Sequence, residues 1–151
     1  MDKTLISMVV PCFNEELAIP KFYEEANRVV LQMNIYDRTE FVFVDDGSSD
    51  GTLRILEELA QNDRRVHFLS FSRNFGKEAA LYAGLSKANG KFTALMDADL
   101  QDPPSLLPEM LESLQKEGFD VVVYADNENQ ALRIQELLLD AVNCKSRPLA
   151  I

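Results

Sequence analysis

The stretch Phe92-Thr93-Ala94-Leu95-Met96-Asp97-Ala98-Asp99-Leu100-Gln101-Asp102-Pro103-Pro104 indicates both a fold and a site. It begins as a short apolar run, which is typical of a buried strand, and it becomes acidic where that strand ends. The two prolines that close it prevent the strand from continuing. The stretch therefore predicts a strand whose carboxyl end presents Asp97 and Asp99 together.

The same unit, an apolar strand followed by a polar loop, recurs along the chain. The first apolar run is predicted to stop at Pro11, and residues 11–15 form its loop. The second is followed by residues 45–52, which are turn formers and helix-capping residues. The predicted strands are residues 5–10, 40–44, 66–70, 92–96 and 119–124.

Segments with apolar residues at helical spacing separate these strands. The predicted helices are residues 19–33, 53–60, 76–89, 105–117 and 127–142, with a loose tail over 143–151. Alternation of strand and helix predicts an α/β fold, a three-layer α/β/α arrangement around a mainly parallel sheet. Ligands of such sheets bind at the carboxyl ends of the strands, where the strand order reverses.

Composition narrows the classes of partner. The 151 residues carry 15 Lys and Arg against 25 Asp and Glu, a formal net charge of -10, so the chain lacks the basic stripe that nucleic acids require. Cys12 and Cys144 are far apart and have no metal-ligand spacing, which predicts a reduced, cytoplasmic setting without a catalytic cysteine. No apolar run reaches the roughly 18 residues of a membrane span.

The two carboxylates of the acidic turn suit a divalent cation. Alternate residues of an extended segment point the same way, so Asp97 and Asp99 can face one ion. Mg²⁺ and Mn²⁺ prefer oxygen ligands and often bridge to substrate phosphates, which makes Asp99 and Gln101 candidate ligands and Asp97 a partner through water or a ribose. The alternative is a solvated acidic turn that caps the helix from Ser105.

Two further loops could hold a nucleotide. Asp46 can accept hydrogen bonds from a base imide or a ribose hydroxyl, whereas Ser49 or Asp50 is assigned to helix capping. Arg73 and Lys77, just before a helix, could neutralise a diphosphate, and the amino end of that helix adds favourable potential. A plain surface turn with cationic side chains is the alternative for Lys77.

Taken together, four stretches resemble family 2 glycosyltransferases of the GT-A fold, and most closely their polyprenyl-phosphate sugar transferase group. They cover roughly the first 123 residues in the order and spacing of that family. The stretches are Val10-Pro11-Cys12-Phe13-Asn14-Glu15-Glu16, Val44-Asp45-Asp46-Gly47-Ser48-Ser49-Asp50-Gly51-Thr52, Arg73-Asn74-Phe75-Gly76-Lys77 and the acidic turn from Met96 to Pro104.

The resemblance implies a role for each matching position. It implies that Pro11, Phe13 and Glu15 line a nucleotide pocket with Val44 and Asp46 beside the base. It also implies that Asp97 and Ala98 contact the nucleotide, while Asp99 and Gln101 face Mg²⁺ or Mn²⁺. The implied reaction transfers a sugar from a UDP-sugar or GDP-sugar to a polyprenyl phosphate, with inversion at the anomeric carbon. Asp97 and Asp99 would support this chemistry, and no acceptor-side catalytic residue is assigned.

The resemblance also divides the chain. We expect residues 1–123 to be the nucleotide-sugar-binding half of a GT-A domain, shorter than that of the family, and residues 124–151 to be an atypical C-terminal helix and tail. Longer family members would work at the cytoplasmic face of a membrane, and the exposed sheet edge makes a homo-oligomer an expectation. The alternative function is a catalytically inactive nucleotide-sugar-binding or interaction domain.

Overall fold

A parallel sheet forms the centre of the computed structural model, which describes residues 3–101, 103–116, 121–122 and 149–150. Within these residues the sheet has the strand order β3-β2-β1-β4-β6-β5, and every neighbouring pair is parallel. The strands are β1 (Ile6–Cys12), β2 (Thr39–Asp45), β3 (Val66–Ser70), β4 (Phe92–Leu95), β5 (Val121–Val122) and β6 (Leu149–Ala150). The mainly parallel α/β sheet is confirmed.

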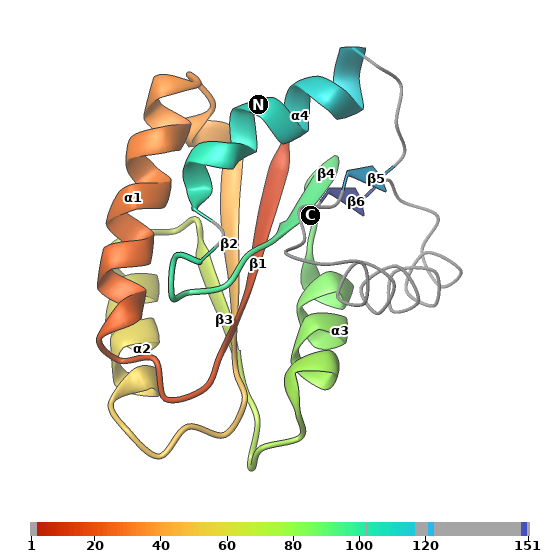
Figure 1. Cartoon of the computed structure of the whole chain (residues 1–151). Coiled ribbons are helices and arrows are strands. Elements are labelled where there is room, and N and C mark those ends of the chain that lie inside the picture. Colours follow the sequence, from red (N-terminus) through yellow and green to blue (C-terminus); the bar gives the residue numbers. More distant parts are fainter. Residues whose placement is uncertain (1–2, 102, 117–120, 123–148, 151) are drawn as a thin grey trace.

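Helices lie on both faces of the sheet, which confirms the three-layer prediction (Figure 1). The α-helices are α1 (Ala18–Gln32), α2 (Thr52–Asn62), α3 (Lys77–Lys87) and α4 (Leu107–Lys116), with short 3₁₀ helices η1 (Tyr36–Arg38) and η2 (Pro104–Leu106). In α1 the buried residues recur at helical spacing, so one stripe faces the sheet. Among the described residues, no helix is long and apolar enough to cross a membrane.

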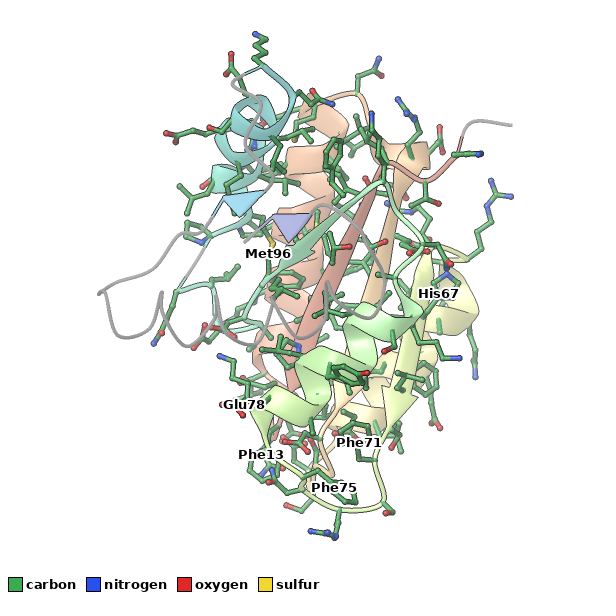
Figure 2. All side chains as sticks on the ribbon, turned by 90° about the vertical axis from the view of Figure 1, so that its right-hand side faces the viewer. Phe13, His67, Phe71, Phe75, Glu78 and Met96 are labelled. Carbon is green, nitrogen blue, oxygen red and sulfur yellow. The ribbon has the colours of Figure 1, made fainter. Side chains whose placement is uncertain are left out.

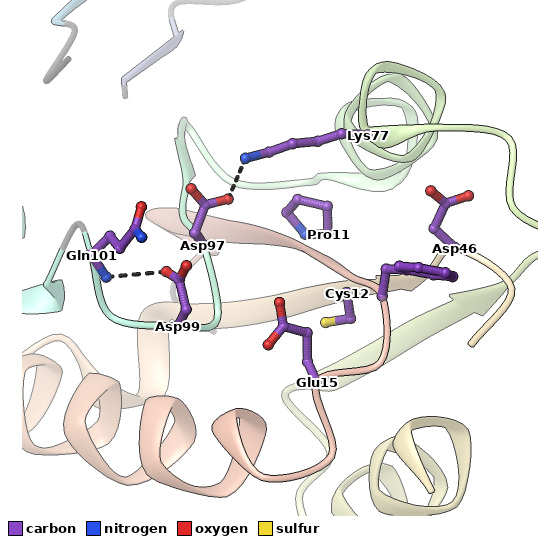
Figure 3. Close-up of a pocket in the computed structure, with 9 residues that line it drawn as sticks. Pro11, Cys12, Glu15, Asp46, Lys77, Asp97, Asp99 and Gln101 are labelled. Carbon is purple, nitrogen blue, oxygen red and sulfur yellow. Dashed lines mark hydrogen bonds and ion pairs between the residues drawn. The ribbon is translucent and has the colours of Figure 1, made fainter. Parts of the chain in front are cut away.

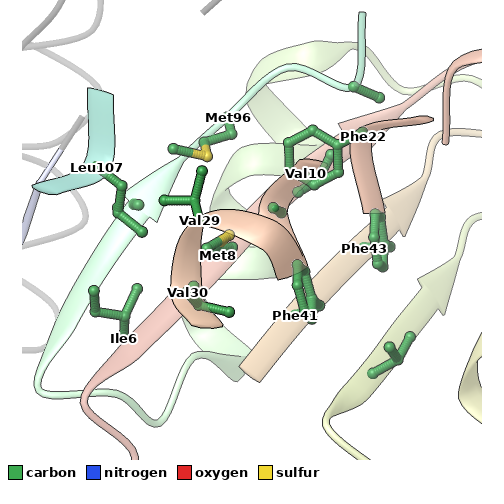
Figure 4. Packing of buried hydrophobic residues seen from close by; sticks show 14 of the residues in the cluster. Ile6, Met8, Val10, Phe22, Val29, Val30, Phe41, Phe43, Met96 and Leu107 are labelled. Carbon is green, nitrogen blue, oxygen red and sulfur yellow. The ribbon is translucent and has the colours of Figure 1, made fainter. Parts of the chain in front are cut away.

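The larger core lies between the sheet and the layer of α1, α2 and α4. Phe41 and Phe43 of β2 stack with ring centroids 5.9 Å apart, and Phe22 of α1 meets Phe43 edge to face at 6.2 Å (Figure 4). Leu107 at the start of α4 and Leu56 of α2 complete this layer. A smaller apolar cluster on the opposite face holds α3 against β1 and β2.

The smaller face also contains a buried polar pair at the amino ends of the strands. Ser7 of β1 and Glu40 of β2 are register partners. The Ser7 hydroxyl donates to Glu40 Oε1 at 2.5 Å, and the backbone amides of Asn89 and Gly90 donate to Glu40 Oε1 and Ser7 Oγ, each at 2.7 Å. Both side chains are thus buried with hydrogen-bond partners, as buried polar groups require.

Two predictions about strand ends are wrong. β1 does not stop at Pro11: it continues to Cys12 and pairs with β2, whereas β4 pairs with β1 only as far as Val9. Pro11 is tolerated because it follows the last aligned pair with β4. Leu149–Ala150 is a short strand between β4 and β5 instead of part of a loose tail. The predicted helix over 127–142 lies outside the described residues.

Candidate functional site

A pocket of about 200 Å³ opens at the carboxyl ends of β1, β2 and β4. The chain runs from β1 to β2 and β3 on one side of β1 and then crosses to β4 on the other, so the strand order reverses at β1. This is the place where open parallel sheets bind ligands. The pocket is lined by Pro11, Cys12, Phe13, Glu15, Asp46, Lys77, Asp97, Asp99 and Gln101 (Figure 3).

The loop after β1 is fixed to the loop after β2 by reciprocal hydrogen bonds. Asn14, in the left-handed region at φ 52, donates its backbone N–H to Ser48 Oγ at 2.9 Å and accepts the Ser49 N–H on Oδ1 at 2.9 Å. The Glu15 N–H donates to Thr52 Oγ1 at 2.9 Å. These bonds place Phe13 and Glu15 before any ligand arrives.

Asp50 performs the capping that the sequence predicts. Its Oδ1 accepts the backbone N–H of Thr52 at 2.9 Å at the start of α2, and its Oδ2 accepts the Glu16 N–H at 3.3 Å. Glu16 returns the contact, because its Oε2 accepts the Gly51 N–H at 2.8 Å. The sequence predicts the cap but not the contacts of Asn14 and Glu16, since their only signal is that each is a polar residue in a strand-end loop.

Asp46 lines the pocket, yet most of its carboxylate is used by the loop before α3. Oδ1 accepts the Phe75 N–H at 2.7 Å, and Oδ2 accepts the Gly76 N–H at 3.1 Å and the Asn74 amide at 3.2 Å. The side chain is 4% exposed. Asp46 is therefore a loop anchor in this structure as well as a pocket residue.

Lys77 reaches across the pocket to the acidic turn. Its Nζ lies 2.7 Å from Asp97 Oδ1, so the first residue of α3 is ion-paired with the first carboxylate after β4. The side chain of Lys77 is largely exposed, and that of Asp97 is partly buried. Arg73, the other predicted cation, does not line the pocket, because its guanidinium lies 4.0 Å above the Phe75 ring.

Carboxylates dominate the end of the pocket opposite Asp46. In the view of Figure 3, Asp97, Asp99 and Gln101 lie at that end, and Glu15 lies between them and Asp46. Burial and the nearby charges of Asp99, Asp97 and Asp50 raise the pKa of Glu15, which Lys77 partly offsets. The local potential is therefore negative and favours a bound cation.

The acidic turn is held in an unusual backbone conformation. Leu100 has φ 63, which is uncommon for a residue with a branched side chain, and the Gln101 N–H donates to Asp99 Oδ1 at 3.1 Å. The turn therefore brings Asp99 and Gln101 side by side on one loop.

The donor chemistry of this end fits a hard divalent ion. Carboxylate and amide oxygens are the ligands that Mg²⁺ and Mn²⁺ prefer, and Asp99 and Gln101 supply one of each. Within the described ranges, no three His, Cys, Asp or Glu side chains form a ready metal-binding group. Such ions commonly keep waters and take substrate phosphates as further ligands, so a two-residue protein contribution suits them.

Three residues stand apart from the predicted pocket lining. The side chains of Val44 and Ala98 are buried in the core and do not line the pocket, although both lie beside residues that do. Cys12 lines the pocket without having been predicted to do so. Burial and the charges of Glu15, Asp45 and Asp97 raise its pKa far above the ordinary range, so it is an inert thiol.

Aromatic side chains gather at the same end of the molecule. Phe13 and Phe75 are 48% and 50% exposed, and Phe71 packs edge to face on Phe75 at 5.6 Å (Figure 2). His67, by contrast, is an exposed residue of the edge strand β3. It lies 3.8 Å from Glu40.

Comparisons with known proteins agree with this geometry. A family model described as glycosyl transferase family 2 matches residues 7–129. A bactoprenol glucosyl transferase of Shigella phage SfV is 48% identical over 118 residues, which are 78% of this chain and 38% of that protein. The chain thus spans little more than a third of the length of that relative.

Solved structures agree on the fold. S. aureus TarS 1-349 in complex with UDP-GlcNAc has a TM-score of 0.62 and 21% identity over 82% of this chain and 36% of that one. The mannosyltransferase PcManGT from Pyrobaculum calidifontis, in complex with GDP-Man and Mn²⁺, has a TM-score of 0.64 and 22% identity over 88% and 38%. On the family match and the identity to the phage enzyme, the chain belongs to glycosyltransferase family 2, and its fold is GT-A.

Proposed function

We propose that this chain carries the donor- and metal-binding half of an inverting glycosyltransferase. The donor is a nucleotide diphosphate sugar, such as a UDP-sugar or GDP-sugar, and the acceptor is a polyprenyl phosphate. One observation carries the proposal: eight of the predicted residues, from four separate segments of the chain, line one pocket at the switch point of the sheet. These residues are Pro11, Phe13, Glu15, Asp46, Lys77, Asp97, Asp99 and Gln101.

The parts of the pocket suit the parts of the donor. Phe13 and Asp46 both line the pocket, where an exposed ring and a carboxylate can meet a base, and Val44 is the buried residue two positions before Asp46. Asp97 and the Ala98 backbone would contact the nucleotide. Asp99 and Gln101 would hold Mg²⁺ or Mn²⁺, which when bound offsets the charge that grows on the leaving diphosphate.

The proposed reaction is a single displacement. An oxygen of the polyprenyl phosphate forms a bond to the anomeric carbon as the bond from that carbon to the diphosphate breaks, so the configuration inverts and a nucleoside diphosphate leaves. The relative named a bactoprenol glucosyl transferase supports this acceptor. Since the acceptor is a lipid, an enzyme that carries this half would work at a membrane, and we propose the cytoplasmic face for it.

Calorimetric titration of UDP-glucose and GDP-mannose, each with Mn²⁺ and with EDTA, tests the proposal. We expect one donor to bind and its affinity to fall at least about tenfold in EDTA or in Asp99→Asn, because a metal ligand is lost. Glu78→Gln is the matched control: it removes another exposed carboxylate, at the start of α3 and outside the pocket, and should bind as the wild type does. Equal binding with and without Mn²⁺ would contradict the metal site.

Sugar transfer separates the two functions that the fold allows. Binding of the donor together with transfer of labelled sugar to a polyprenyl phosphate supports the enzyme. Binding without any transfer supports the alternative, a nucleotide-sugar-binding or interaction domain, and would overturn the proposed catalysis.

A further inference from the structure

Asp46 faces the loop before α3 more completely than it faces the pocket. A carboxylate offers about four lone-pair positions, and three of those on Asp46 are taken by Asn74, Phe75 and Gly76. Two of these donors are the backbone N–H groups of Phe75 and Gly76, so Asp46 holds the backbone of this loop directly. One position, on Oδ1, remains for a ligand.

The residue after Asp46 permits this close contact. Gly47 has φ 72, and a Cβ placed there would lie 2.2 Å from the carbonyl carbon of Arg73 and 2.5 Å from the Asn74 nitrogen. Only glycine lets the two backbones approach so closely. Asp46 and Gly47 therefore form one seat for residues 73–76.

The seat determines where α3 begins. Gly76 has φ 102, a conformation that residues with a Cβ rarely adopt, and it turns the chain directly into the helix at Lys77. Lys77 is thus one residue beyond a backbone amide held by Asp46. Its ammonium lies 2.7 Å from Asp97 on the other side of the pocket.

We propose that Asp46 is a positioning residue that acts through Lys77: by holding residues 74–76 it places the Lys77 ammonium on Asp97. The contact between Lys77 and the diphosphate of the donor rests on the proposed function, whereas the Lys77–Asp97 contact does not. In the ligand-free chain the Lys77 ammonium neutralises part of the negative charge at Asp97. The same ammonium is then already placed to contact the diphosphate of a donor. A base contact through the remaining lone pair is compatible with this role.

The competing interpretation is that Asp46 serves the ligand alone. In that case the Lys77–Asp97 contact would not depend on Asp46, and loss of the Asp46 charge would leave Mn²⁺ binding unchanged or slightly weaker. The positioning role predicts the opposite sign, because an unanchored Lys77 no longer neutralises the Asp97 carboxylate beside the proposed metal ligands Asp99 and Gln101. The sign of the change therefore separates the two interpretations.

The first measurement uses the ligand-free chain. An ion-paired lysine ammonium exchanges its protons slowly enough to be followed by ¹⁵N NMR at low temperature. We expect the Lys77 signal in the wild type and in Asp45→Asn, and its loss in Asp46→Asn and Asp97→Asn. Asp45→Asn is the matched control, since Asp45 is the neighbouring buried carboxylate but binds Ser48 and Ser70 instead of residues 74–76.

The second measurement is the affinity for Mn²⁺ alone, followed by electron paramagnetic resonance. We expect Lys77→Met to bind Mn²⁺ about threefold to tenfold more tightly, since it removes a cation from Asp97. Asp46→Asn should raise the affinity for Mn²⁺ by a similar factor. The double variant Asp46→Asn with Lys77→Met should bind Mn²⁺ no more tightly than either single variant. Asp45→Asn should not gain.

Each outcome decides one question. A persisting Lys77 signal in Asp46→Asn, or additive effects in the double variant, would overturn the positioning role. If Asp46→Asn does not fold, Gly47→Ala is the second variant: its Cβ would lie 2.2 Å from the Arg73 carbonyl carbon and displace residues 73–76 from Asp46, so an undiminished Lys77 signal there would overturn the positioning role. A wild type that binds neither Mn²⁺ nor a nucleotide sugar refutes the proposed function, while the lysine spectrum still decides whether Asp46 positions Lys77.

Discussion

Glu15 illustrates how single residues of the pocket are tuned by their neighbours. It lies between Asp46 and the acidic turn in the view of Figure 3, and burial together with the charges of Asp99, Asp97 and Asp50 disfavours its ionised form. An ionised Glu15 attracts a cation, but in the ligand-free chain it lowers the free energy of unfolding. This decrease can be measured, because it depends on pH.

We predict that Glu15→Gln stabilises the ligand-free chain at neutral pH. The folded state binds the Glu15 proton more tightly than the unfolded chain, whose pKa is the ordinary 4.5, so the free energy of unfolding falls as pH rises through the window above 4.5. Removing the carboxylate should restore about 0.5 kcal/mol at pH 7, a small value because of solvent screening.

Urea denaturation from pH 4 to pH 8 checks this prediction. The advantage of Glu15→Gln over the wild type should shrink toward zero at the acidic end, where Glu15 is protonated in both states. An advantage that is equally large at pH 4 would contradict the assigned cause.

The loops around the pocket are held to one another by hydrogen bonds and close backbone contacts. The loop after β1 and the loop after β2 share hydrogen bonds in both directions, and the loop before α3 rests on Asp46 and Gly47. Preformed contacts of this kind reduce the ordering that a ligand must induce. The stability of the pocket edge should therefore depend on a few buried polar atoms.

Thr52→Val is predicted to lower the free energy of unfolding by about 1–3 kcal/mol. Thr52 is fully buried, its Oγ1 accepts the Glu15 N–H at 2.9 Å, and valine of the same shape would leave that N–H without a partner. Urea denaturation measures the loss. Ser49→Ala, which removes an exposed hydroxyl 3.4 Å from Asn14 Oδ1, should change stability by less than about 0.5 kcal/mol. Equal losses in the two variants would show that burial is not the cause.

The sequence predicts the bounds of helices and strands better than it predicts the contacts between them. Period and turn chemistry predict β3 at its observed bounds, and they place α1 within one residue at each end. They could not predict that Pro11 stays in β1, because that depends on where β4 leaves its neighbour. Nor could they show that Asp46 contacts residues 74–76, since that distance along the chain is closed only by the tertiary fold.

The whole molecule is organised from the centre of the sheet outward. β1 pairs along its full length with β2 and on its other side with β4, whereas β4 and β6 share one aligned pair, Ala94 and Ala150. The candidate pocket opens above the central strands, and its lining residues come from the carboxyl ends of β1, β2 and β4 and from Lys77 at the start of α3. The part of the sheet that holds the pocket is therefore the part with the most extensive strand pairing.

Native-state hydrogen exchange should reveal this gradient. Amides in the middle of β1 and β2, such as those of Val9 and Val42, should exchange only through global unfolding, because both residues are fully buried in the centre of the sheet. The amides of Leu149 and Ala150 should exchange at least about tenfold faster through local opening. Equal protection of both sets would contradict the gradient.

The buried Ser7 and Glu40 pair disfavours a shifted register between β1 and β2. A parallel sheet with apolar residues on both faces could otherwise mispair by one or two residues at little cost. A slipped β2 would carry the Glu40 carboxylate away from Ser7, Asn89 and Gly90 and leave it buried without donors, which costs several kcal/mol. Correct pairing at this end fixes Cys12 against Asp45 at the other. A mispairing penalty remote from the pocket thus protects the alignment on which donor recognition depends.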